Sequence, residues 1–104
     1  MPFASPYKRD IHFSRHGAKF GAATAEQYEQ MADEFLFGMM DHDTREGFRI
    51  NDRLRFKDSN RHFGVAAIAA PEHIRTFYPV PAIKITNRGG CAAFFTYECG
   101  REDL

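Results

Sequence analysis

Residues 24–36 read TAEQYEQMADEFL, and this stretch predicts the helix on which the rest of the fold depends. Thr24 and Gln27 have the spacing of a capping box, in which the threonine hydroxyl accepts from the later amide and the glutamine reaches back. The acidic residues lie mostly off the apolar positions and predict a solvated face. The apolar positions repeat at helical spacing and predict a face packed on the core: Tyr28, Met31, Ala32, Phe35, Leu36 and Met39.

The segment before this helix carries two histidines and two cations within residues 12–21, HFSRHGAKFG. Residues 9–18 could form a short helix, with Gly17 and Gly21 marking the connection to the next one. That face would be either a solvated basic surface or a reactive cluster. Its four side chains share one side of a helix, because their spacings are three, one and three: His12, Arg15, His16 and Lys19.

From Gly47 onward the pattern changes to the alternation that is typical of strands. FRINDRLRF, residues 48–56, predicts a hairpin that turns at Asn51–Asp52. IKITNRGGCAAFFTYE, residues 83–98, predicts a last hairpin after two prolines that end the preceding strand. The elements expected between them are a turn at 57–60, a buried strand at 61–69, a turn at 70–73 and a strand at 74–80.

The order of these elements predicts an α+β fold in a single domain over residues 1–104. A helical part covers about 9–40, and its helices pack on one face of a twisted antiparallel β-sheet of about four to six strands over about 47–98. A chain of 104 residues with 43% hydrophobic residues is large enough for one core. Cys91 and Cys99 fit no zinc-site spacing, and we expect partly buried thiols near a C-terminal strand, or a hairpin disulfide if the protein is exported.

Hydropathy and charge narrow the classes of protein. No apolar run approaches the roughly 20 residues of a transmembrane helix, and the N-terminal MPFASPYKRD lacks the apolar centre of a secretory signal. We therefore expect a cytoplasmic protein without a membrane partner. The net charge is zero, from 14 basic and 14 acidic residues, which weakens any simple argument for nucleic-acid binding. The acids concentrate between Glu26 and Asp43, which predicts one acidic and one basic face.

The histidine cluster fits acid–base chemistry better than metal binding. His12 and His16 have the spacing of a helical zinc pair, but the glutamate of HExxH is missing and two cations oppose a dication. We expect no metal and no cofactor. An imidazole titrates near neutrality, and a nearby guanidinium or ammonium stabilises charge on a phosphate. RNA supplies its own nucleophile, the 2′-hydroxyl, so this inventory could run ribonucleolytic transesterification.

Two later stretches carry further candidates. In HIRTFY, residues 73–78, strand alternation places Thr76 and Tyr78 on one face with Ile74, as a hydroxyl pair or as ordinary sheet packing. In RLRFKDSNRHFGV, residues 53–65, aromatic residues interleave with cations. Such aromatics stack bases in RNA-binding proteins, but they are also common core residues between solvated basic side chains. The cations of this stretch that could bind RNA are Arg53, Arg55 and Lys57.

Four motifs in order resemble one family. HFSRHGAKFG, TAEQYEQMADEFL, FKDSNRHFGV and HIRTFYPV together resemble the small toxin domains of the barnase–EndoU–colicin–RelE-like ribonuclease class, over residues 10–80. The resemblance implies N-terminal helices on an antiparallel sheet and metal-independent endoribonuclease activity on tRNA or mRNA. It also implies a bacterial toxin or effector that is delivered into the cytoplasm of a target cell and neutralised by an acidic immunity or antitoxin protein.

The resemblance also assigns roles to residues. It implies that His12 or His16 is the general base, that Arg75 binds the scissile phosphate, and that Thr76 and Tyr78 hold or protonate its oxygens. Lys19 stands where the family motif has glutamate, and Glu72–His73 replace a glycine turn. The alternative is a non-catalytic module on the same scaffold that binds protein or nucleic acid. The expected RNA-binding residues are Arg15, Lys19, Arg53, Arg55 and Lys57.

Overall fold

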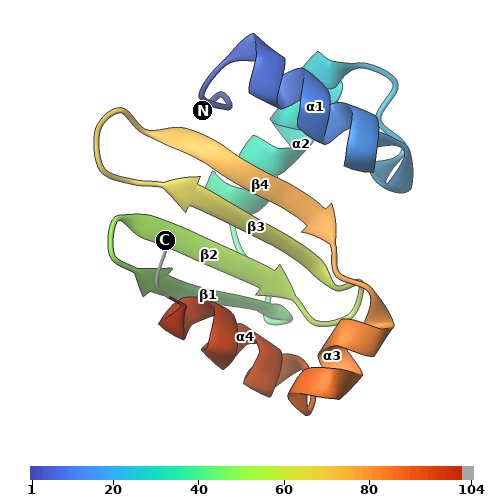
Figure 1. Cartoon of the computed structure of the whole chain (residues 1–104), viewed down its shortest axis with the longest axis vertical. Coiled ribbons are helices and arrows are strands. Elements are labelled where there is room, and N and C mark those ends of the chain that lie inside the picture. The colour runs from blue at the N-terminus through green and yellow to red at the C-terminus, as the bar shows by residue number, and fades with distance from the viewer. Residues whose placement is uncertain (102–104) are drawn as a thin grey trace.

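The structure is a computed structural model that describes residues 1–101. Within these residues the strands form one four-stranded antiparallel sheet, in the order β1-β2-β3-β4. Figure 1 shows α1 and α2 on one side of this sheet and α3 and α4 on the other. The predicted α+β class is confirmed. The elements are α1 (Pro6–His16), η1 (Gly17–Phe20), α2 (Ala25–Phe37), β1 (Thr44–Arg49), β2 (Asp52–Lys57), β3 (His62–Ala67), β4 (His73–Pro79), α3 (Ala82–Arg88) and α4 (Cys91–Gly100).

Helix α2 forms where the capping box predicted it. The Thr24 hydroxyl accepts from the Gln27 amide at 3.1 Å, and the Gln27 side chain accepts from the Ala23 amide at 2.7 Å, one residue earlier than in the standard box. Tyr28 is fully buried and its hydroxyl donates to the Phe77 carbonyl of β4. Met39 lies beyond the last turn and is fully exposed, so the apolar face ends with the helix.

The first hairpin turns one residue earlier than predicted. Ile50 and Asn51 form the turn, with Asn51 at φ 63°, and Arg49 is paired with Asp52 across it. Asparagine tolerates the left-handed region better than most residues, so it suits this position. The shift places Asp52 inside β2, where it is only 1% exposed.

The predicted C-terminal hairpin is wrong, because residues 82–100 form α3 and α4 and the sheet ends at Pro79. Pro81 is at the N-cap of α3, and Gly89 ends that helix at φ 97°. Gly90 follows at φ 115° and leads into α4. Two consecutive glycines serve a helix–helix connection as well as they serve a strand turn, since both need positive φ.

The helices cover both faces of the sheet, so there are two cores rather than one. The core on the α2 face is formed by Phe3, Tyr28, Ala32, Leu36, Ala66, Ile74 and Phe77. The core on the α4 face is formed by Leu54, Phe56, Phe63, Val65, Val80, Ile85, Phe94 and Phe95. Cys91 and Cys99 pack against the second core from α4, as free thiols on a helix rather than on the expected strand.

The helices are short. The longest, α2, has 13 residues. Among residues 1–101, no helix has both the length and the apolar content that crossing a membrane requires.

Candidate active site along strand β4

Helix α1 brings both histidines to the outer edge of the sheet. Ser5 caps the helix by accepting from the Lys8 amide at 3.2 Å, and Pro6 follows in the first turn. The chain before the helix is tied to β4, because the Ile74 amide donates to the Pro2 carbonyl at 2.8 Å. The His12 ring therefore stacks on Phe3, with 5.1 Å between ring centroids.

The second histidine reaches β4 itself. The rings of His16 and Tyr78 stack with centroids 5.4 Å apart and an interplanar angle of 30°. His12 lies 6.3 Å from His16, ring to ring, and lines a hollow of about 240 Å³ together with Arg75. The fold thus brings the histidines of the N-terminal segment to the residues of HIRTFY, which are some sixty positions later in the sequence.

The surroundings of both imidazoles favour the neutral form. Burial lowers the pKa of His12 and of His16 below the ordinary value of 6.5, and the charge of Arg15 lowers each pKa further. Lys19 has a stronger effect than Arg15 on the pKa of His16. The Nδ1 atoms of both rings are buried and have no hydrogen-bond partner among the described residues. A neutral imidazole at pH 7 can accept a proton, which a general base requires.

The pKa of Tyr78 is shifted in the opposite direction. Burial raises the pKa of its phenol above the ordinary 10.0, and the Glu98 carboxylate raises it further, so the hydroxyl stays protonated and can donate. Glu98 lies on α4, is 7% exposed, and accepts from Arg101 Nη1 at 3.3 Å. Glu98 was not predicted as a site residue, because residues 91–98 were expected to form a strand. A glutamate three and four positions after Phe95 and Phe94 would have been a signal on a helix.

A β-bulge sets the direction of Arg75. Val65 pairs with Thr76, but Ala66 pairs with Ile74, so Arg75 has no partner residue in the ladder. The prediction that Ile74 shares a face with Thr76 and Tyr78 is therefore wrong, since Ile74 is buried in the core on the α2 face.

The Arg75 guanidinium points to a buried carboxylate. Its Nε donates to Asp52 Oδ1 at 2.8 Å, and Arg49 Nε donates to Asp52 Oδ2 at 3.1 Å. The Arg49 Nη1 also donates to the Glu98 carbonyl at 3.1 Å, so this cluster connects the β1–β2 hairpin, β4 and α4. Arg75 lines a hollow of about 610 Å³ together with Arg49 and Arg101.

Two of the expected RNA-binding residues, Arg53 and Arg55, contact the end of α2 instead. Arg55 Nη1 donates to the carbonyls of Phe35 and Gly38 at 3.2 and 2.7 Å, and its Nε donates to Glu46 at 2.8 Å. The Arg53 guanidinium lies 5.0 Å from the Phe37 ring centroid. Cations at a helix C-terminus satisfy its last carbonyls and its dipole. These arginines alternate with core residues of the α4 face, so they lie on the face opposite Tyr78.

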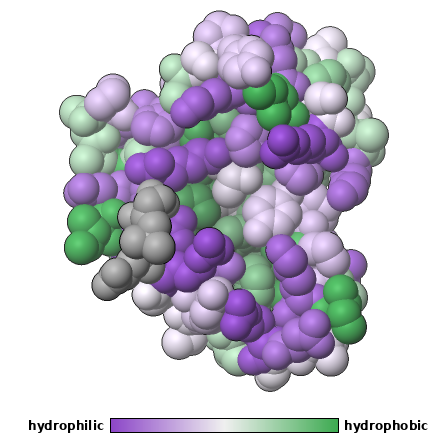
Figure 2. Space-filling view, viewed as in Figure 1, coloured by the Kyte–Doolittle hydropathy of each residue, from purple (hydrophilic) through white to green (hydrophobic). Residues whose placement is uncertain are grey.

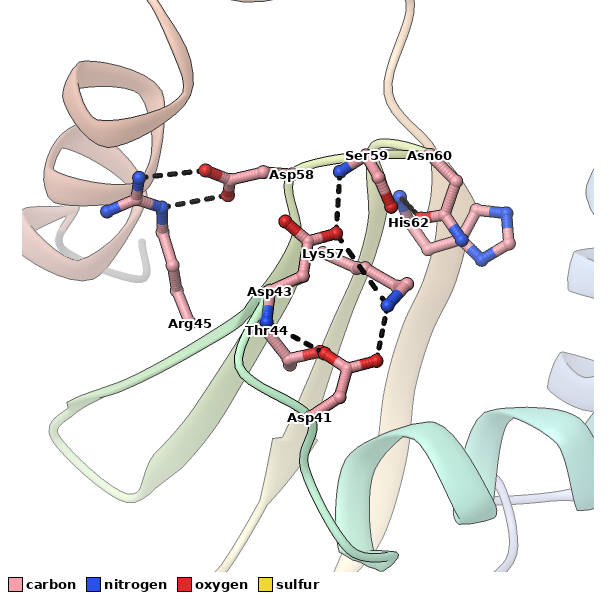
Figure 3. A network of polar contacts seen from close by, with 9 residues as sticks. All are labelled: Asp41, Asp43, Thr44, Arg45, Lys57, Asp58, Ser59, Asn60 and His62. Carbon is pink, nitrogen blue, oxygen red and sulfur yellow. Dashed lines mark hydrogen bonds and ion pairs between the residues drawn. The ribbon is translucent and has the colours of Figure 1, made fainter.

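Lys57 is part of a network at the end of β2 in which carboxylates outnumber cations (Figure 3). Its ammonium pairs with Asp41 and lies 3.7 Å from Asp43. The hydrogen bond from Lys57 is the largest cause that lowers the pKa of Asp41 to about 2. Arg45 and Asp58 form a bidentate pair beside it, with both bonds at 2.8 Å.

The remaining cations have a different placement. Among residues 1–101, several basic side chains have no carboxylate within ion-pair distance, and they lie on α1, on η1, in the β2–β3 turn and on α3. Helix α1 packs on β4 and α3 directly follows it. We call these side chains the cations along β4, because α1 packs on β4, Arg61 donates to the Val80 carbonyl just after β4, and α3 is the next helix in the chain. They are Lys8, Arg15, Lys19, Arg61, Lys84 and Arg88.

Comparisons with known proteins give no relative. No protein-family model, no curated protein and no solved structure matches this chain. The residues of the structure therefore carry the functional argument alone. Within residues 1–101, no group of three or more histidine, cysteine, aspartate or glutamate side chains is arranged to hold a metal ion.

Proposed function

We propose that the protein is a metal-independent endoribonuclease that cuts RNA through its 2′-hydroxyl. The observation that supports this most is the stack of His16 on Tyr78, which joins a neutral imidazole to a protonated phenol. A base and a donor side by side, with unpaired cations around them, match the needs of phosphoryl transfer.

The proposed reaction uses these groups in one displacement. The neutral imidazole of His16 accepts the proton of the 2′-hydroxyl, and the oxygen attacks the adjacent phosphorus. The bond from phosphorus to the 5′-oxygen breaks, the leaving oxygen takes the proton of the Tyr78 hydroxyl, and the imidazolium returns a proton to Tyr78. The products carry a 2′,3′-cyclic phosphate and a free 5′-hydroxyl. His12 lies beside His16, while Arg15 and Lys19 offset the charge that builds on the phosphate.

The biological setting follows from the same proposal. We propose that the enzyme cuts tRNA or mRNA as a toxin in the cytoplasm, including that of a target cell into which it is delivered. A neutralising immunity protein would then present an acidic surface to the unpaired cations along β4.

The test is cleavage of labelled RNA by the full chain. We expect cyclic-phosphate products, unchanged activity in EDTA, and a loss of roughly 10²- to 10⁴-fold in His16→Ala. Tyr78→Phe removes the donor and keeps the ring, so it should lose activity without losing the stack. His42→Ala is the matched control, because His42 is exposed in the α2–β1 connection and should not matter. An inactive intact protein, or a fully active His16→Ala variant, would contradict the proposal.

A second candidate is a non-catalytic module that binds nucleic acid or protein. The observation that favours it is the ion pair of Arg75 with Asp52, because a guanidinium held by a buried carboxylate is less able to bind a phosphate. This candidate predicts that His16→Ala leaves partner binding unchanged and that the intact chain cuts no RNA.

A further inference from the structure

We infer that the groove between α3 and α4 is a subsite for single-stranded RNA, which holds a nucleotide next to the bond that is cut. This inference rests on the proposed function, since it extends the same site. The groove is a hollow of about 390 Å³. Its polar lining comes from α3, from α4 and from the residue that ends α4: Lys84, Asn87 and Arg88, then Tyr97 and Glu98, and Arg101.

The centre of the groove is a stacked pair. The Arg88 guanidinium carbon lies 3.4 Å from the Tyr97 ring centroid, so the plane of the guanidinium is held against the ring. No carboxylate within residues 1–101 pairs with Arg88. Its N–H donors are therefore oriented but not satisfied by an acid. A planar guanidinium of this kind can bind phosphate oxygens in a bidentate way and can stack on a base.

The groove shares a lining residue with the hollow beside Arg75. Arg101 lines it and also lines the hollow that contains Arg75. Glu98 also lines the groove, and its charge adds to the rise in the pKa of Tyr78. Figure 2 shows the surface hollowed between the α1–α2 part of the molecule and the α3–α4 part. A strand that binds Arg75 in the neighbouring hollow would meet Arg101 next and then the groove that contains Arg88.

The chemistry of the lining favours RNA over a protein partner. Lys84, like Arg88, has no acidic partner among the described residues, so the groove offers net positive charge to phosphates. Asn87 adds an amide for a base edge, and Tyr97 is 43% exposed beside it. Aromatic and guanidinium planes beside unpaired cations are how single strands are held, because an unpaired base presents its flat face. A protein anchor would need a larger apolar surface at the centre.

The experiment measures binding apart from cleavage. An RNA of about 12 nucleotides with 2′-O-methyl groups throughout has no nucleophile, so fluorescence anisotropy reports its affinity alone. We expect Arg88→Ala and Tyr97→Ala to raise the Kd roughly 5- to 150-fold, which is the value of one stacked base. Lys84→Gln should lower the salt dependence of log Kd by about 0.7. Lys57→Gln is the matched control, because its charge is already paired with Asp41, and it should change neither quantity.

The outcomes separate the inference from the proposed function. Tight binding that is lost in Arg88→Ala and Tyr97→Ala, with no cutting of ordinary RNA, keeps the subsite and removes the nuclease. Cutting by the intact protein with unchanged Kd in both variants keeps the nuclease and overturns the subsite. No binding by the intact protein also overturns the subsite. Thermal melting of each variant shows whether it is folded, and Lys84→Glu, an exposed charge reversal, gives an independent reading if Tyr97→Ala is unstable.

Discussion

Strand β2 and the edge along β4 both carry cations between aromatic residues, yet their cations differ in what they contact. On β2, Arg55 is held by Glu46 and by the carbonyls of Phe35 and Gly38 at the end of α2, and Lys57 is held by two aspartates. Along β4, Lys19 and Arg88 have no acidic partner within residues 1–101. A basic residue is therefore judged as a binding candidate by the charge opposite it, and not by its place in a basic stretch.

The physical reason is the free energy that a partner already supplies. A cation that is paired in the free protein must give up that pair before it gains a phosphate. An unpaired cation releases a condensed counterion from RNA, and the whole free energy of that release contributes to binding. The comparison predicts that changes on β2 alter stability, whereas changes along β4 alter RNA binding and cutting.

The largest expected effect on the β2 side is at Asp52. Its carboxylate is 1% exposed and compensates both Arg49 and Arg75. Asp52→Ala removes the buried carboxylate that accepts from Arg49 and Arg75 and should lower the free energy of unfolding by about 3–5 kcal/mol. Urea denaturation measures this loss. Asp10→Ala is the control, since Asp10 is exposed and pairs with Arg9 at the surface, and it should cost under about 1 kcal/mol.

A smaller loss of stability is expected at Arg55. Arg55→Gln removes the charge that binds Glu46 and two carbonyls at the end of α2, and it should cost about 2–3 kcal/mol. The same variant should bind 2′-O-methyl RNA with the affinity of the intact protein at a temperature where it is folded. A marked loss of RNA affinity in folded Arg55→Gln would break the comparison.

The histidines along β4 predict a dependence of stability on pH. The pKa of His12 and of His16 lies below 6.5 in the folded state, so between the two values the unfolded chain binds more protons. The free energy of unfolding should therefore have its highest value above pH 6.5 and should fall as the pH drops below 6.5. Urea midpoints at pH 7.5 and 5.5 measure the fall, which should be smaller in His16→Gln than in His42→Gln.

The smallest expected effect is a change in RNA affinity, which should distinguish Lys19 from Lys57. Lys19→Gln should weaken RNA binding a few-fold and lower the salt dependence of log Kd by about 0.7, because one phosphate contact is lost. Lys57→Gln removes the same charge from β2 and should leave both quantities unchanged. Equal effects of the two substitutions would show that only the total charge matters, and the contrast between the regions would then be lost.

The local parts of this fold could be predicted from the sequence. The capping box and the apolar spacing define α2 because both act within a few residues. The C-terminal helices could not, since the apolar run in CAAFFTYE fits a buried strand as well as a buried helix. What decides between them is the apolar surface of β2 and β3 on which Phe94 and Phe95 pack, and that surface exists only in the folded sheet.

The candidate site also has features that the sequence predicts and features that depend on the folded sheet and helices. The histidines and the HIRTFY residues stand out by type, and their order along the chain suggested that they meet. The compensation of Arg55 by Glu46 depends on the register of β1 against β2, which pairs these two residues directly. A hairpin predicted to turn one residue later gives a different pairing. Glu98 and the groove beside it required the helix that the sequence analysis missed.

The bulge in β4 has a consequence for how the strand tolerates deletion. Ile74 already faces the same side as Ala66, and Thr76 the same side as Val65. Residue 75 is thus an insertion in a ladder that is complete without it. If residue 75 were deleted, all the remaining side chains of β4 would stay on the faces that they occupy now. The backbone pairing of β4 does not require Arg75. The role of Arg75 is instead to donate a hydrogen bond to the buried carboxylate of Asp52 on β2.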